Sequence, residues 1–127
     1  MGMTPGQQAL QRYTNHAHHA MAVAIWDDLS GHGLRVLDGE APADDRDSGV
    51  VLSLGKDGIY LDWQLDRDRE HKIYDKTLRA EQARSISAVM TGAVASSLAA
   101  LGYRVHADFA DALPAPTLVV DDMPLRS

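Results

Sequence analysis

The longest periodic stretch of the chain, residues 78–101, predicts an amphipathic helix with two usable sides. One stripe at helical spacing suits a buried side and consists of Ala83, Ile86, Met90, Val94, Ser97 and Leu101. A second stripe contains only small residues, namely Ala88, Gly92, Ala95, Ser96 and Ala99. Because small residues allow another backbone to approach closely, we expect one side of this helix to cover a sheet and the other to contact a further element.

Another helix is predicted near the start of the chain. Thr4 and Gln7 have the spacing of a capping box, and apolar residues at helical spacing continue as far as Leu29. Two glycines beyond residue 30 end this pattern. Trp26 falls opposite the apolar stripe, so it is either buried on a second side of the helix or presented to a partner.

Five strands are predicted from alternating or apolar runs bounded by turn residues, at 34–37, 50–54, 59–65, 103–109 and 117–120. Residues 55–58, with the sequence Gly-Lys-Asp-Gly, predict a hairpin between the second and third strands. The element order is α-β-β-β-α-β-β. It predicts an α+β fold with two long helices on a single antiparallel sheet of about five strands. We expect one domain over residues 1–127, with frayed ends at 1–3 and 122–127 and an acidic loop at 38–48.

This element order, together with the size and acidity of the chain, resembles the family of small, acidic, homodimeric secretion chaperones. The resemblance covers most of the chain and includes no residue motif. Proteins of that family pair through their second long helix. The resemblance therefore implies a homodimer with the small-residue stripe near its interface, that is, Ala88, Gly92, Ala95, Ser96 and Ala99.

The charge of the chain limits its partners. Eighteen acidic residues against twelve basic ones give a formal net charge of −6, which disfavours contact with nucleic-acid phosphates. The chain has no cysteine, which excludes disulfides and thiolate metal sites. The longest apolar run, 20–26, is too short to span a membrane, and the first residues lack the pattern of a signal peptide. We therefore expect a cytoplasmic protein without a cofactor and without nucleic-acid or membrane contacts.

Histidines provide the one pattern that suggests chemistry. On a continuous helix His16 and His19 share a face, whereas His18 points away from His16. A metal site would need a further ligand, for which His106 is a candidate. His106 also shares a predicted strand face with Asp108, and a histidine beside a carboxylate is the minimum for acid–base catalysis. Histidines on a helix surface are the more common meaning of such a pattern, so no metal site is predicted.

These observations favour a non-catalytic protein-interaction module, either chaperone-like or of the inhibitor and immunity type, whose partner is another protein. Trp26 and the outward strand residues Tyr60 and Arg104 are the candidate partner contacts. Two alternatives stay open. One is a small metal-dependent or acid–base enzyme that uses the histidines at positions 16, 19 and 106, and the other is a small-molecule binding domain with its pocket between helix and sheet.

Overall fold

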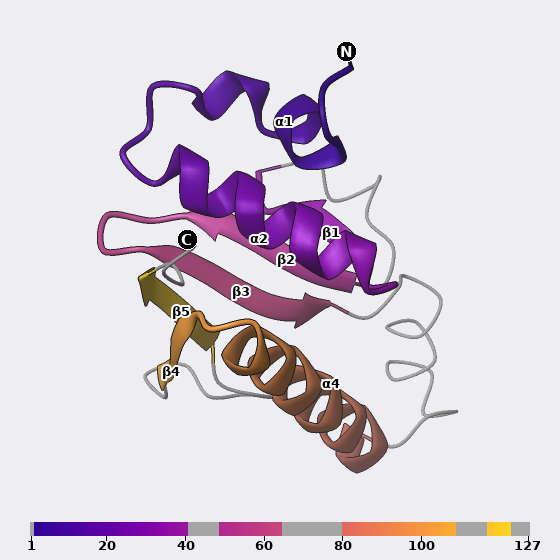
Figure 1. Cartoon of the computed structure of the whole chain (residues 1–127). Helices are drawn as coiled ribbons and strands as arrows, with labels where there is room; N and C mark the ends of the chain where they lie inside the picture. Colours follow the sequence, from indigo (N-terminus) through magenta and orange to yellow (C-terminus); the bar gives the residue numbers. More distant parts are fainter. Residues whose placement is uncertain (1, 41–48, 65–79, 109–116, 123–127) are drawn as a thin grey trace.

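The computed structural model describes residues 2–40, 49–64, 80–108 and 117–122, and of residues 80–85 and 108 only the backbone. It has mixed α+β character with a five-stranded sheet, as expected (Figure 1). The elements are α1 (Pro5–Ala9), the 3-10 helix η1 (Gln11–Tyr13), α2 (His19–Gly31), β1 (Val36–Asp38), β2 (Gly49–Leu54), β3 (Ile59–Gln64), α4 (Ala80–Ala100), β4 (Arg104–Asp108) and β5 (Thr117–Asp122). The predicted helix start at 78, the acidic loop beyond 40, the strand end at 109 and the tail beyond 122 lie outside the described residues.

The sheet is mixed, which corrects the prediction of a purely antiparallel one. Its strand order is β1-β2-β3-β5-β4, and every neighbouring pair is antiparallel except β1 and β2, which run parallel. Backbone hydrogen bonds fix this direction, since Val50 N–H donates to the Arg35 carbonyl and Gly39 N–H to the Leu52 carbonyl, both at 2.8 Å. Parallel strands require the chain to return between them, and residues 39–48 make that connection.

The hairpin predicted at residues 55–58 is confirmed. Leu54 and Ile59 are partners in the β2–β3 register, and Gly55 N–H donates to the Gly58 carbonyl at 2.8 Å. The predicted alternation in β3 is also present. Ile59 and Leu61 are buried, whereas Asp62, which follows Leu61, is exposed. One side of the strand therefore faces the core, as period-two patterning requires.

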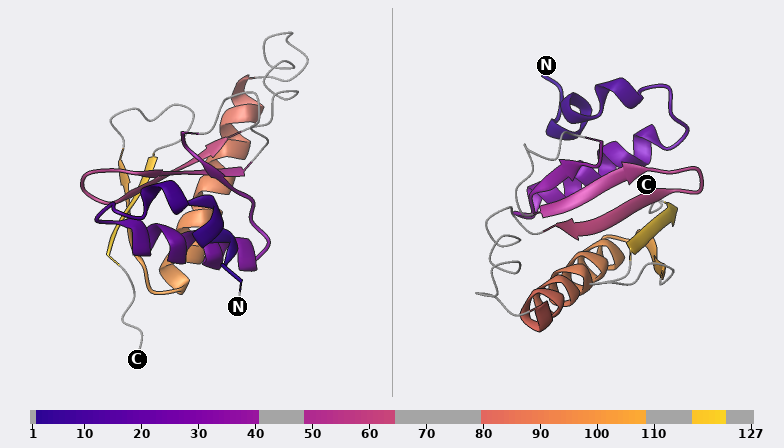
Figure 2. Two further views of the ribbon diagram at one scale, coloured as in Figure 1. Left: turned by 90° about the horizontal axis from the view of Figure 1, so that it is seen from above. Right: turned by 180° about the vertical axis from the view of Figure 1, so that it is seen from behind.

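The helices α2 and α4 enclose the main core against the sheet. α2 lies over β1 and β2, whereas α4 packs against β3 and β4 (Figure 1). Their buried residues form one cluster with alternate strand residues, among them Ile25, Leu29, Leu52, Leu61, Val94, Leu98 and Val120. The view from behind shows β2 and β3 in front of α2, that is, the side of the sheet away from this helix (Figure 2). On that side the register places Ser53, Tyr60, Val119 and His106 in one row.

The N-terminal region is not one long helix, and this corrects the second prediction about the fold. The capping box is confirmed: Gln7 N–H donates to Thr4 Oγ1 at 3.1 Å and Thr4 N–H donates to Gln7 Oε1 at 2.9 Å. However, α1 ends at Ala9, and α2 begins only at His19. The interruption includes Thr14, Asn15 and His16, which have low helix propensity. The 3-10 helix η1 lies within it, and α1 packs on α2.

A cluster around Asp38 ties this N-terminal region to the sheet. Tyr13 donates a hydrogen bond from its hydroxyl to Asp38 Oδ1 at 3.0 Å and lies 3.2 Å from Glu40 Oε2, and Arg12 forms an ion pair with Asp38. Partial burial, followed by the hydrogen bond to Asp38 and its negative charge, raises the pKa of Tyr13 to about 12. The neutral phenol is thus the form that this cluster stabilises.

Alkaline titration should detect this cluster. The pKa of Tyr13 in the folded chain exceeds its ordinary value of about 10, so its stabilising effect is fully present below pH 10 and is lost as the pH rises through about 12. Ultraviolet phenolate absorbance should show a late ionisation step that Tyr13→Phe removes and that Asp38→Asn moves towards lower pH. Completion of the phenolate signal near pH 10 in the wild-type protein would contradict this contact.

The buried side of α4 is rotated relative to the prediction. Ser87, Thr91, Val94 and Leu98 are buried, whereas the other described members of the predicted core stripe, Ile86, Met90, Ser97 and Leu101, are half-buried. The side chain of Ala83 lies outside the described residues. Two residues with hydroxyl groups, Ser87 and Thr91, thus occupy buried positions. Because both are polar, the pattern of apolar residues predicted a different buried side for this helix.

Candidate interaction face

The exposed side of α4 is the most unusual surface of the described chain. We define the α4 face as its exposed residues from position 88 onward, which are Ala88, Val89, Gly92, Ala93, Ser96, Ala99 and Ala100. The chain as a whole is 24% charged, yet residues 86–103 contain no charged residue. A solvent-facing helix side normally carries charged and polar residues. Such an uncharged face is typical of a surface that another element covers.

The small-residue stripe of the sequence analysis belongs to this surface. Ala88, Gly92, Ser96 and Ala99 are exposed, and Ala95 is half-buried beside them. A Cβ built on Gly92 meets nothing within 4 Å. The protomer itself therefore does not require a glycine here, although glycine weakens a helix interior by about 0.5–1 kcal/mol relative to alanine.

Val89 is the residue that sequence reasoning missed. It is 68% exposed, and Met3 is the only other large hydrophobic residue to be exposed among the residues whose side chains are described. The position of Val89 near the predicted small-residue stripe did not by itself indicate that its side chain is exposed. The signal was available in the uninterrupted absence of charge from residue 86 to residue 103, which embeds Val89 in a neutral surface.

An open groove lies next to the α4 face, between α4 and the edge strand β4. It has a volume of about 330 Å³ and is lined by Ala95, Ser96, Ala99, Val105, His106, Ala107 and Leu118. The groove exists because alanine and serine occupy the positions where α4 approaches β4. We call it the α4–β4 groove. It shares Ser96 and Ala99 with the α4 face, so the two features form one continuous surface.

Charged groups near this surface gather at one end of the sheet. Asp121 Oδ1 lies 3.5 Å from Arg104 Nε, and Asp121 Oδ2 lies 3.6 Å from His106 Nδ1. The side chains of Arg104 and His106 are more than half exposed, and such exposed pairs contribute little to stability. Arg104, His106 and Asp121 thus lie at the edge of the surface that the α4 face and the α4–β4 groove form.

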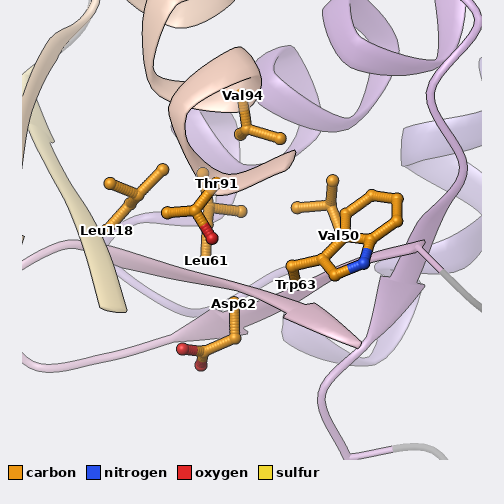
Figure 3. Close-up of a pocket in the computed structure, with 7 residues that line it drawn as sticks. All are labelled: Val50, Leu61, Asp62, Trp63, Thr91, Val94 and Leu118. Atoms are coloured by element: carbon orange, nitrogen blue, oxygen red, sulfur yellow. The ribbon is translucent and has the colours of Figure 1, made fainter. Parts of the chain in front are cut away.

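A second, narrow space lies beneath α4 (Figure 3). Thr91 and Val94 face the strand residues Val50, Leu61, Trp63 and Leu118 across it. It amounts to about 160 Å³ between the side chains but does not admit a water-sized sphere. Thr91 Oγ1 and Trp63 Nε1 are buried there without a hydrogen-bond partner. This space is therefore a gap in the packing between side chains, too narrow for a ligand.

The histidines do not form the arrangement considered from the sequence. Because α2 starts at His19, His16 and His18 lie before it, and their ring centroids are 5.7 Å apart. His18 N–H donates to His16 Nδ1 at 3.0 Å, and His18 Nε2 lies 3.1 Å from the Lys56 carbonyl oxygen. Within the described ranges no group of three or more His, Cys, Asp or Glu side chains is placed to hold a metal ion, so His16, His19 and His106 do not converge.

Of the acid–base candidates, His106 lies beside the carboxylate of Asp121. The side chain of Asp108 lies outside the described residues. The pairing of His106 with Asp108 therefore stays a prediction.

Of the three predicted partner contacts, Trp26 belongs to α2, whereas Tyr60 and Arg104 belong to the sheet. Trp26 is half-buried, packs against the core cluster and lies beside Gly6 of α1. Tyr60 lies on the sheet side away from the helices, with its ring over Gly55, and Arg104 lies at the exposed start of β4. Arg104 and His106 both contact Asp121, and His106 lies in one row with Tyr60. Tyr60 and Arg104 therefore lie on one side of the sheet, and Trp26 lies apart from them.

Comparison of the chain with protein-family models, with curated proteins and with solved structures gives no match. Among the helices of the described residues, none has both the length and the apolar character needed to cross a bilayer.

Proposed function

We propose that this chain is a non-catalytic protein-interaction module that acts in the cytoplasm as a homodimer paired through the α4 face. The observation that carries the proposal is the exposed, charge-free surface of α4 from Ala88 to Ala100, on a chain with a net charge of −6. Contacting surfaces gain free energy from apolar area removed from water, and depletion of charge marks the centre of protein interfaces. A chaperone-like or inhibitor-type role fits such a dimer, because either class works by binding another protein.

The alternatives have less support. A metal-dependent enzyme would need converging ligands, and the described histidines and carboxylates do not provide them. A small-molecule domain would need an enclosed pocket between helix and sheet. Of the two spaces beside α4, the one beneath the helix does not admit a water-sized sphere, and the α4–β4 groove is open to solvent.

The variant Gly92→Leu tests the proposal. A leucine side chain meets open space in the protomer, so the free energy of unfolding of the protomer should stay constant or rise by about 0.5–1 kcal/mol as the glycine cost is removed. At a dimer interface the same side chain would hold the two helices apart. Sedimentation over a dilution series should therefore show weaker self-association, with unfolding measured separately by urea at the lowest concentration.

Ala20→Leu provides the matched control. Ala20 is also an exposed small residue in a helix, but it lies in α2. The control should keep the self-association of the wild-type protein. A wild-type chain that remains monomeric at every concentration would contradict the homodimer.

A further inference from the structure

We propose that the two copies pair antiparallel, with their α4 helices crossing between Gly92 and Ala93 and with Val89 of each copy seated against the Ser96–Ala99 turn of the other, at the opening of the α4–β4 groove. This inference rests on the proposed homodimer and adds its geometry. In this arrangement the exposed side chain of Val89 meets the α4–β4 groove of the other copy, and each copy has both features.

The neutrality of the α4 face favours a second copy as its occupant. A charged partner surface would leave its charges buried without counterions against this face, which is costly. A second copy presents a face of equal neutrality. The remainder of the chain carries the net charge of −6, so two copies meet with least repulsion where neither is charged.

The distribution of side-chain size favours the antiparallel direction. Val89 is the only large residue of the α4 face and lies seven positions before Ser96. A parallel pair would place Val89 against Val89 and leave a gap between the small residues further along. An antiparallel pair centred between Gly92 and Ala93 places Val89 opposite Ser96, and interfaces pack best when large residues face small ones. Opposed helix dipoles add to the same preference.

Close approach is possible at the crossing point. Gly92 has no neighbour within 4 Å of a constructed Cβ, and Ala93 next to it is exposed. Helix axes that meet at such residues come near the lower end of the usual 8–10 Å range. The α4–β4 groove then receives part of the partner's Val89, which explains why an apolar groove adjoins the face.

The absence of cysteine from the chain allows a direct test by disulfide formation. Val89→Cys and Ser96→Cys are made separately, and neither position is buried, so both variants should fold. A disulfide requires Cα atoms within about 7 Å. Mild oxidation of a mixture of the two proteins should give a linked dimer that reduction removes, whereas each variant alone should remain largely unlinked. Ala93→Cys, near the crossing point, should link to itself, and Ala20→Cys on α2 serves as the unlinked control.

The outcomes separate the inference from the proposed function. If sedimentation shows a dimer but Val89→Cys links mainly to itself, or no variant on α4 links, the antiparallel pairing is wrong and the homodimer stands. If the wild-type chain sediments as a monomer throughout, the homodimer fails together with this geometry, and a different protein is the occupant of the face. Self-linking by Ala20→Cys to the same extent would mean that collision alone forms the disulfides, and it would overturn the assignment.

Discussion

Ser96→Glu is expected to convert the proposed dimer into folded monomers. Ser96 is exposed in the protomer, so glutamate is accommodated there without disturbing the core. In the proposed pair each new carboxylate would face Val89 of the other copy, in a neutral and partly dehydrated contact. Unpaired or like charges at an interface cost several kcal/mol, and each 1.4 kcal/mol is tenfold, so the dissociation constant should rise about 100-fold or more.

Sedimentation velocity over a dilution series measures this effect directly. Ala20→Glu adds the same charge to an exposed helical position in α2 and should leave the dimer unchanged, which separates a local effect from that of higher net charge. Circular dichroism should show the same helix content in both variants. Equal self-association of Ser96→Glu and the wild-type protein would mean that the α4 face is not the contact surface.

Gly58→Ala is expected to cause the largest loss of stability among single-methyl additions. Gly58 is buried at the start of β3, where that strand pairs with β5. A Cβ built there would lie 2.4 Å from the Val120 carbonyl oxygen. This neighbour is backbone of a central strand, so it cannot rotate away as a side chain would. Forcing additional volume into a packed site costs about 1–3 kcal/mol, and we expect the upper end of this range.

Urea denaturation followed by circular dichroism is the appropriate measurement. Gly31→Ala serves as the control, because a Cβ at that helical position meets nothing within 4 Å. It should leave the unfolding midpoint unchanged or raise it slightly. If the two variants unfold at the same urea concentration, the close approach of β3 and β5 at Gly58 is not present in solution.

Local signals predicted much of this fold. The capping box at Thr4, the hairpin at residues 55–58 and the alternation in β3 each depend on a few neighbouring residues, and each is found in the structure. Such features follow from backbone geometry and from side-chain hydrogen bonds within a few positions. They therefore require no knowledge of the rest of the molecule.

Features that depend on distant contacts were predicted less well. The parallel direction of β1 is determined by hydrogen bonds to β2 across the connection at residues 39–48, and no local pattern encodes it. The interruption before α2 also involves distant partners, since Tyr13 reaches Asp38 and His18 reaches Lys56. In both cases tertiary contacts outweigh helical or strand periodicity.

The candidate site was predicted in part, for a related reason. Its small residues were recognisable from their helical spacing, and four of the five are exposed. The side of α4 that is buried was misjudged because Ser87 and Thr91 replace apolar residues in the core. Val89 and the α4–β4 groove require knowledge of how α4 is rotated against the sheet, which the sequence pattern alone does not provide.

The short length of β1 has a consequence for aggregation. The other edge strand, β4, has five residues, whereas β1 has three, and Arg12 and Tyr13 bind Asp38 at its end. Strands from other molecules add to a sheet edge through successive backbone hydrogen bonds, and a short edge offers few of them. This side of the sheet is therefore a poor template for the addition of strands from other molecules.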